Sequence, residues 1–339
     1  MEKFITSLSI VIPIFNASSY IEKLLERIDK TKNLLSGAKV NLIEVICVCD
    51  EPIDNSFEII KNLQEKYKYL RVIELSSNTG QHLATSAGIV SSIGDWVCTL
   101  DEDLQHDPMH IIELLITSTK NSKDLVYAKS IKGTHRKYFT RDLPSKLAKN
   151  IVSLFTGINL RIISSFRLIR GNVARSCATS MDKYQYLDNL LFYLTSEKRR
   201  ENVYLKFFDK RPKNSSGYNF ISLLSHFFRT LYSSEIGARR FFLILFIPII
   251  FISILIGLYL FIISQYKSAY LTVPGWTSLF VMEILILLIL GLFFTFSIKM
   301  YSIIALRSLS ITPYLTIDRS SDKNVYKNLK INFIKSEKY

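Results

Sequence analysis

The sequence contains no internal repeat and no low-complexity or linker-like stretch, so nothing in it indicates an array of similar modules. Its N-terminal apolar stretch, in MEKFITSLSIVIP, is too short for a signal peptide and instead predicts a β-strand. We therefore expect the N-terminal part of the chain to stay in the cytoplasm. With 339 residues, the chain is long enough for one α/β domain of ordinary size plus an additional segment.

Cysteine is scarce, and the four cysteines lie in the part of the chain expected to be cytoplasmic, where thiols remain reduced. Cys47 and Cys49 stand one residue apart on an expected strand. No second pair accompanies them, so a metal site built on cysteine is only weakly indicated. The sequence favours their interpretation as small, buried apolar side chains.

Acidic residues are outnumbered, because 29 Asp and Glu face 43 Lys and Arg, which gives a net charge of +14. The excess concentrates between residues 120 and 240, where 24 basic residues accompany 8 acidic ones. A basic surface near membrane segments suits anionic lipid headgroups and phosphates. Nucleic acid is the usual alternative partner for such a surface. The membrane-length runs described next argue against it, so we expect no nucleic-acid partner.

Two long apolar runs stand out near the C-terminus, at residues 241–263 and 273–298. The first holds no charge, and Glu283 is the only charge of the second; its role stays open. About 20 apolar residues span a bilayer core as a helix, so both runs predict transmembrane helices. The alternative, a pair of buried core helices, is disfavoured because long helices that are apolar on all sides are rare in cores.

The basic residues around these runs predict the orientation of the chain. Arg239 and Arg240 precede the first run, Lys299 and Arg307 follow the second, and the loop between them carries only Lys267. Because basic residues stay on the cytoplasmic side, both ends should be cytoplasmic.

Two further segments complete the expected domain organisation. Residues 219–240 predict a juxtamembrane amphipathic helix lying on the membrane, with an ordinary surface helix as the alternative. Residues 299–339 form a cytoplasmic tail.

The first 130 residues alternate short β-rich runs with helical segments. Strands are expected at residues 8–14, 42–48, 71–75, 96–100 and 125–128, and helices at 18–32, 56–67, 81–92 and from 108 onward. Such alternation is typical of βαβ units and predicts an α/β fold with a parallel sheet.

Polar side chains follow the expected strands, at the edge where ligands bind in open α/β sheets. Asp101 and Asp103 come after a buried strand, WVCTL, and two such carboxylates can point into one cavity. Hard oxygen ligands favour Mg²⁺ or Mn²⁺, which could bridge the phosphates of a nucleotide sugar. An acidic triplet is commonly only a solvated loop, which is the alternative. The other strand-end candidates are Pro13, Asn16, Asp50, Asp54, Asn78, Gly80 and Gln105.

Four segments resemble family 2 glycosyltransferases of the GT-A fold. SIVIPIFNASSYI is similar to their first strand and helix, VCDEPIDNS to their nucleotide-binding turn, SSNTGQHLATSAGI to their N-x-G helix start, and TLDEDLQHDP to their D-x-D-L-Q-x-x-P metal motif. SSFRLIRGNV, KRPKNSSGYNFISLL, RSLSITPY and the two apolar runs resemble the polyprenyl-phosphate branch, which includes dolichol-phosphate mannose synthases and undecaprenyl-phosphate glycosyltransferases. The resemblance covers nearly the whole chain and implies a GT-A domain over residues 1–218, its membrane-facing basic part beginning near 130.

The resemblance also implies roles for single residues. Asp50 would bind the nucleotide base, and Asp101 the ribose, the phosphate or the metal. Asp103 and Gln105 would ligate the metal, and Arg167 would hold phosphate charge, so Asp101, Asp103 and Arg167 are the catalytic candidates. Pro13, Asn16, Asp54, Asn78 and Gly80 would contribute to the donor site, and Lys210, Arg211 and Ser216 would lie on a segment closing over the donor diphosphate.

The chain departs from the family at three places near these residues. Gly217 and Tyr218 follow Ser216, where a basic residue and then tyrosine are common. Glu51 and Pro52 replace the usual Gly-Ser, which alters the contacts to base or ribose, and Ser165 stands where an acidic residue is common. A lipid phosphate monoester is mostly ionised at pH 7, since its second pKa is about 6, and needs no strong general base. Asp188 is a candidate base without further support. The histidines at 82, 106 and 135 are interpreted as surface or structural residues.

The implied function is metal-dependent, inverting transfer of a sugar from a nucleotide diphosphate to a polyprenyl (undecaprenyl) phosphate for cell-surface glycans. UDP is the default nucleotide, with dTDP or GDP as alternatives. The alternatives for the protein are an enzyme that extends a lipid-linked glycan and a non-catalytic nucleotide-sugar-binding protein of the membrane. The resemblance further implies a multi-pass protein of the bacterial inner membrane, in contact with membrane lipids, that forms a homo-oligomer.

Overall fold

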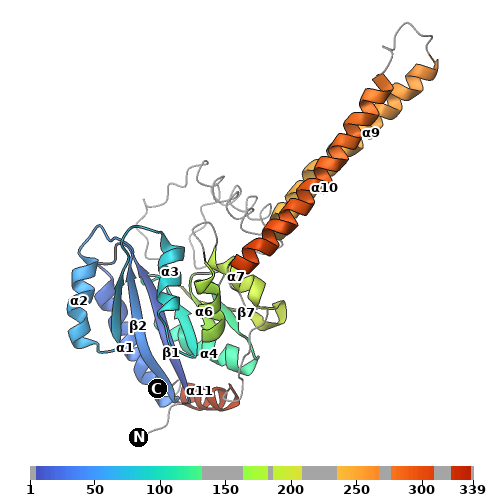
Figure 1. Cartoon of the computed structure of the whole chain (residues 1–339). Helices are drawn as coiled ribbons and strands as arrows, with labels where there is room; N and C mark the ends of the chain where they lie inside the picture. Colours follow the sequence, from blue (N-terminus) through green and yellow to red (C-terminus); the bar gives the residue numbers. More distant parts are fainter. Residues whose placement is uncertain are drawn as a thin grey trace. The chain divides into compact units, whose positions relative to one another are not determined.

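A computed structural model describes residues 5–131, 163–181, 186–207, 235–266, 276–308 and 322–336 (Figure 1). The chain forms two compact units. The first consists of Met1–Lys146, Asn159–Asn219 and Thr312–Tyr339, and the second of Leu147–Ile158 and Phe220–Ile311.

The first unit is built on a seven-stranded sheet with the strand order β3-β2-β1-β4-β6-β5-β7. All five predicted strands are present, so the α/β prediction is confirmed, and β6 and β7 were not predicted. The strands are β1 (Thr6–Ile14), β2 (Val40–Cys49), β3 (Leu70–Glu74), β4 (Trp96–Thr99), β5 (Leu125–Ser130), β6 (Arg167–Arg170) and β7 (Arg200–Leu205).

The sheet is mixed, which corrects the prediction of a parallel sheet. β1 pairs in parallel with β2 and β4, β2 with β3, and β5 with β7, but β6 runs antiparallel to both β4 and β5. The chain enters β6 at the end of the sheet where β4 and β5 finish, so Thr99 faces Arg167 and Trp96 faces Arg170. A four-residue strand with arginine at both ends gives too weak a pattern to be recognised in a sequence.

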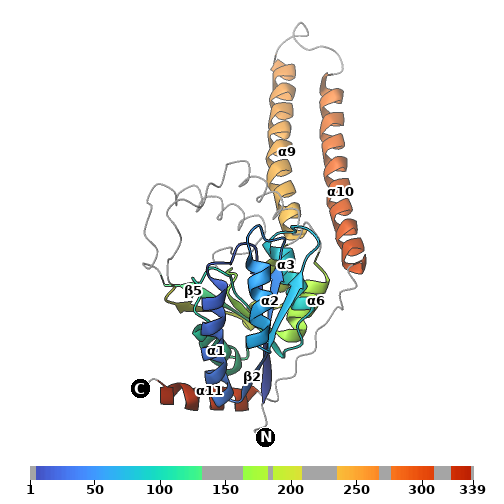
Figure 2. The ribbon, with the colours of Figure 1, turned by 90° about the vertical axis from the view of Figure 1, so that its left-hand side faces the viewer.

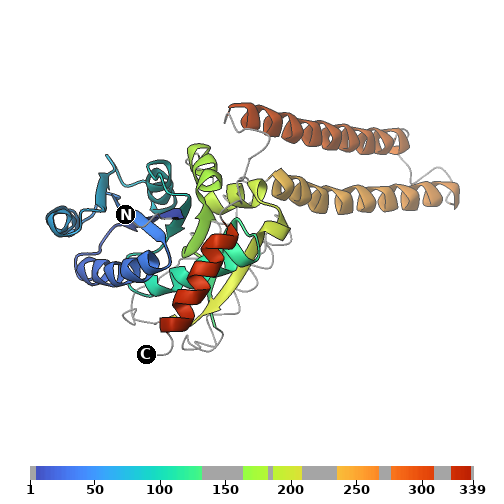
Figure 3. The same ribbon diagram turned by 90° about the horizontal axis from the view of Figure 1, so that it is seen from below.

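Helices cover both faces of the sheet (Figure 3). α1, α4 and α11 pack on one face, and α3 and α6 on the other. The helices are α1 (Ile21–Gly37), α2 (Ser56–Lys66), α3 (Gln81–Val90), α4 (Ile111–Lys120), α6 (Gly171–Thr179), α7 (Leu187–Leu194) and α11 (Asp322–Ser336), with short 3₁₀ turns η1 (Pro108–His110) and η2 (Glu197–Arg199).

Alternation along β1 supplies both faces with apolar side chains. Ile10 and Ile12 belong to the main core cluster with Leu24 of α1. Val11 points to the other face, where Gly88 lets α3 approach closely: a Cβ on this glycine would lie 2.4 Å from a methyl carbon of Val11. This contact fixes the distance between α3 and the strands whose ends carry the polar residues.

The helix α11 belongs to the first unit and packs against α4 and α1. Val325 and Leu329 are each only 1% exposed there. From the sequence this region was predicted only as a tail, because these two buried positions lie among lysines and asparagines.

The second unit contains α9 (Glu235–Tyr266) and α10 (Trp276–Ser308), which contact each other (Figure 2). The window Val281–Ile298 of α10 has a mean hydropathy of 2.6 and no buried residue, so by length and composition it can cross a membrane. Among the described residues of α9, the apolar segment Ile247–Tyr259 is shorter than a membrane span. Within the described ranges, one of the two predicted spans is thus long and apolar enough to cross a membrane.

Candidate active site

A cavity of about 630 Å³ opens at the C-terminal ends of β1, β2 and β4. Seven residues singled out from the sequence lie on its wall: Pro13, Asp50, Asn78, Gly80, Asp101, Asp103 and Gln105. Six further lining residues were not predicted: Ile14, Phe15, Tyr20, Gln81, Ala84 and Glu102. The parallel strands thus bring together polar residues that are far apart in the sequence.

Asp101 is delivered to this wall by β4, whose four residues are all buried. Both oxygens of its carboxylate accept hydrogen bonds. Gln81 Nε2 donates to Oδ1 at 2.6 Å, and the Ser165 hydroxyl donates to Oδ2 at 2.5 Å. These donors fix the direction in which the carboxylate faces the cavity.

Asp103 and Gln105 are joined by a tight turn at Leu104, whose φ of 59° lies in the left-handed region. Such a conformation costs a non-glycine residue about 1–2 kcal/mol. The Leu104 side chain is 3% exposed and anchors the turn in the core. The turn lets Gln105 donate to Asp103 from its backbone N–H, at 3.2 Å, and from Nε2, at 2.5 Å.

The carboxylates fit a cation that arrives with a phosphorylated ligand. No group of three or more His, Cys, Asp or Glu side chains is placed to hold a metal ion within the described residues. Mg²⁺ is usually bound by one or two carboxylates together with substrate phosphates, so an all-protein cage is not required. Asp101 and Asp103 line the same cavity and supply such a donor set.

Asp50 and Glu51 hold the loop that precedes α3. Asp50 accepts the backbone N–H groups of Thr79, at 2.7 Å, and Gly80, at 2.8 Å, and Glu51 accepts that of Asn78, at 2.9 Å. Glu51 has a φ of 52°, a conformation natural to glycine, which is the residue usual here in the family that the sequence resembles. The amides before α3 are therefore bonded to carboxylates of the protein itself.

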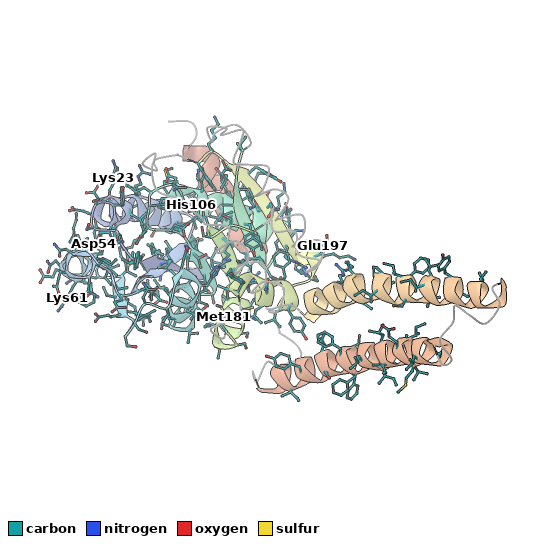
Figure 4. All side chains as sticks on the ribbon, turned by 90° about the horizontal axis from the view of Figure 1, so that it is seen from above. Lys23, Asp54, Lys61, His106, Met181 and Glu197 are labelled. Atoms are coloured by element: carbon teal, nitrogen blue, oxygen red, sulfur yellow. The ribbon has the colours of Figure 1, made fainter. Side chains whose placement is uncertain are left out.

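Asp54, labelled in Figure 4, connects the loops after β1 and β2. It does not line the cavity. Its carboxylate accepts from the backbone N–H of Ser18 at 3.0 Å and from the N–H and hydroxyl of Ser56. Partial burial alone would raise the pKa of Asp54, but these hydrogen bonds lower it to about 2.

Glu102 holds the loop after β1 in a similar way. It accepts the backbone N–H groups of Phe15, at 2.8 Å, and Asn16, at 3.2 Å, so Asn16 takes part through its backbone without lining the cavity. Burial raises the pKa of Glu102, although the two N–H groups act in the opposite direction. Asp54 and Glu102 together set the positions of the loops that form the wall.

Residues 9–175 match the family described as Glycosyl transferase family 2. The chain carries a family 2 glycosyltransferase domain. The match contains the complete wall of the cavity described above. The glycosyltransferase class predicted from the sequence is thereby confirmed.

This glycosyltransferase is similar to two relatives and, more distantly, to one solved structure. It is 27% identical over 278 residues to undecaprenyl-phosphate 4-deoxy-4-formamido-L-arabinose transferase of Shewanella sediminis, covering 80% of both chains. It is 28% identical over 185 residues to dodecaprenyl-phosphate galacturonate synthase of Rhizobium johnstonii, where the match spans about half of each chain, 53% and 52%. Glucosyl-3-phosphoglycerate synthase from Mycobacterium tuberculosis, crystallised with Mn²⁺, UDP and phosphoglyceric acid, is 16% identical with a TM-score of 0.47, over 66% of this chain and 78% of that one.

Arg167 of this glycosyltransferase is not on the cavity wall. It is 3% exposed and forms an ion pair with Asp188, which also accepts a hydrogen bond from the Tyr127 hydroxyl at 2.7 Å. Burial by itself lowers the pKa of Arg167, but Asp188 and Tyr127 outweigh it and raise that pKa. Asp188, the candidate base, is 4% exposed and is occupied by this network.

The remaining predicted residues fall in two groups. His106, labelled in Figure 4, is 7% exposed. Its ring packs against Phe166 and Phe207, and its Nδ1 lies 3.9 Å from Asp101 Oδ2. The His82 ring contacts Tyr186, and the structural roles of both histidines stay predictions. Lys210, Arg211, Ser216 and His135 lie outside the described residues, so their roles stay predictions.

Gln81 and Ser165 were not predicted as site residues. Gln81 directly follows the N-x-G segment, so that motif could have indicated it as a site residue. The contact of Ser165 with Asp101 depends on β6, a strand that the sequence pattern did not predict.

Proposed function

We propose that this glycosyltransferase moves a sugar from a nucleotide diphosphate sugar to a polyprenyl phosphate, using Mg²⁺ or Mn²⁺ and inverting the configuration at the transferred carbon. The observation that carries the proposal is the placement of Asp101 and Asp103 on one cavity of about 630 Å³ at the strand ends. A cavity of this volume suits a small organic ligand such as a nucleotide sugar. A UDP-sugar is the first donor to test.

A role for a cation is compatible with the loop before α3. The amides of Asn78, Thr79 and Gly80 are bonded to Glu51 and Asp50, so these three amides do not contact a diphosphate. A cation on the cavity wall would add positive charge beside a departing diphosphate. Asp101 and Asp103 would hold the cation, and the bound cation would supply electrostatic stabilisation of the leaving group.

The acceptor is inferred from the relatives and from the state of Asp188, the candidate base named from the sequence. Asp188 is committed to Arg167, and Ser165 donates to Asp101. A phosphate monoester, with a second pKa of about 6, can attack the sugar carbon directly, and a single displacement inverts that carbon. Two relatives, an undecaprenyl-phosphate arabinose-derivative transferase and a dodecaprenyl-phosphate galacturonate synthase, support a polyprenyl phosphate as the acceptor.

We further propose that α9 and α10 both cross the bacterial inner membrane, with the catalytic domain and both chain ends in the cytoplasm. The exposed apolar window Val281–Ile298 and the basic residues flanking the two helices support this arrangement. Cysteine accessibility in intact cells would test it: a cysteine introduced in the 267–272 loop should react with an impermeant reagent, and one introduced in α11 should not.

The decisive experiment incubates the purified full-length protein with undecaprenyl phosphate, Mn²⁺ or Mg²⁺ and a panel of nucleotide sugars. Mass spectrometry of the lipid fraction then identifies donor and acceptor together. A lipid-phosphate sugar product is expected. Transfer only to a lipid that already carries a glycan would replace the proposed acceptor, and no transfer with any donor would overturn the proposal.

A further inference from the structure

Ser165 faces Asp101 because of the antiparallel pairing of β4 and β6. Thr99 faces Arg167 in the observed register. The same register, continued by two residues on each strand, sets Asp101 opposite Ser165, and opposed residues point to the same side of a sheet. The Ser165 hydroxyl accordingly donates to Asp101 Oδ2 at 2.5 Å.

The backbone at Ser165 is held by the sheet on both sides of this contact. The Thr99 hydroxyl donates to the carbonyl oxygen of Ser165 at 2.6 Å. Phe166, the next residue, is fully buried. The position of the serine hydroxyl is therefore set by main-chain packing and not by a freely moving loop.

The second oxygen of the Asp101 carboxylate is held from another direction. Gln81, the first residue of α3, donates to Oδ1 at 2.6 Å. One neutral donor from α3 and one from the approach to β6 thus meet the two oxygens, and His106 Nδ1 lies 3.9 Å from Oδ2, beyond hydrogen-bond distance. A carboxylate oxygen can accept a second interaction, so the carboxylate can still bind a cation or a donor hydroxyl, but only in the orientation that the two hydrogen bonds permit.

We infer that Ser165 is a positioning residue, which holds the Asp101 carboxylate in the orientation that receives the nucleotide donor and its cation. The inference rests on the proposed function. A carboxylate at position 165 would face Asp101 as a like charge, whereas the hydroxyl donates to it.

The test measures donor binding separately from turnover, on the full-length protein in detergent. Calorimetry with UDP, GDP and dTDP in the presence of Mn²⁺ compares the wild type with Ser165→Ala, Ser165→Thr and Ser164→Ala. Because a hydrogen bond to a charged group is lost, Ser165→Ala should weaken Mn²⁺–nucleotide binding about tenfold. Ser165→Thr keeps the hydroxyl and should restore most of the affinity.

Ser164→Ala is the matched control, since Ser164 makes no side-chain hydrogen bond in the part of the chain that the structure describes. Its affinity should equal that of the wild type, and thermal unfolding should show that all variants are folded. Equal affinity of Ser165→Ala and wild type, or equal weakness of the Thr and Ala variants, would overturn the inference. Tight Mn²⁺–nucleotide binding without transfer to a polyprenyl phosphate would overturn only the proposed acceptor. No nucleotide binding by the wild type would overturn both the proposed function and the inference about Ser165.

Discussion

Arg167 and Asp188 form an ion pair inside the first unit, where the two residues are 3% and 4% exposed. Asp188 accepts a second hydrogen bond from Tyr127, whose pKa burial and Asp188 raise well above its usual value. Two charges at this depth are stable only as a pair, because either one alone would remain buried without compensation.

Removing one partner should therefore destabilise the domain. Arg167→Leu is expected to lower the free energy of unfolding by about 3–5 kcal/mol, and a double Arg167→Met/Asp188→Leu variant should recover much of that loss. Arg199→Leu, at an exposed arginine, serves as the control. Thermal unfolding followed by circular dichroism measures the effect. A stable Arg167→Leu variant that has lost donor binding would instead restore the phosphate-holding role predicted from the sequence.

The case of Arg167 shows how far the sequence can be interpreted. The Phe166-Arg167-Leu168 motif identified a residue that the domain needs, but the motif carries no information on whether the guanidinium faces a ligand or a core carboxylate. Arg167 and Asp188 are 21 positions apart, and their contact depends on β6 and α7.

By contrast, Asp50, Asp101 and Asp103 could be placed at the cavity from the sequence alone. Each follows a run of buried, β-rich residues, and the ends of parallel strands meet at one edge of the sheet. Ser165 and α11 could not be placed, because a four-residue antiparallel strand and a helix with two buried positions give no distinct period.

Asp50 and Glu51, the neighbouring carboxylates that hold the loop before α3, should differ in how much they contribute to stability. Asp50→Ala leaves two backbone N–H groups without their acceptor and should lower the free energy of unfolding by about 1–3 kcal/mol. Glu51→Gly removes one hydrogen bond but places glycine at a φ of 52°, so the net change should stay within about 1 kcal/mol. Thermal unfolding of both variants checks this order. A larger loss for Glu51→Gly than for Asp50→Ala would show that the left-handed backbone is not strained.

The buried thiols should be unreactive in the folded protein. Burial raises the pKa of Cys49 and of Cys177 to about 12 and raises those of Cys47 and Cys98 as well. The thiolate fraction at pH 8 is then very small, and labelling by a thiol reagent should be slow until guanidinium unfolds the chain and all four cysteines react.

The same pKa shifts set the direction of a pH effect on stability. Since the unfolded thiols lose their protons near pH 8.5 and the folded ones only near 12, the stability from these thiols is complete below about pH 8.5 and falls as the pH rises toward 12. Denaturant unfolding at pH 7, 9 and 10 measures this fall in the free energy of unfolding.

The labelling experiment has its own contrary outcome. Rapid labelling of the native protein at pH 8 would contradict the burial of these side chains.

Removal of one carboxylate or of the cation should stop turnover while the domain stays folded. Asp103→Asn keeps the shape of the side chain and its neighbour Gln105 but loses the charge that would hold the cation, so turnover should fall about 100- to 1,000-fold. Asp107→Asn removes the same charge four residues later, where Asp107 accepts the N–H of Met109 at the start of η1. This control should retain turnover and lose about 1 kcal/mol of stability at most.

Removal of the cation should have the same effect as removal of the Asp103 charge. EDTA should abolish wild-type turnover, and added Mn²⁺ should restore it. Full activity of Asp103→Asn, or of the wild type in EDTA, would refute a cation held at this strand end.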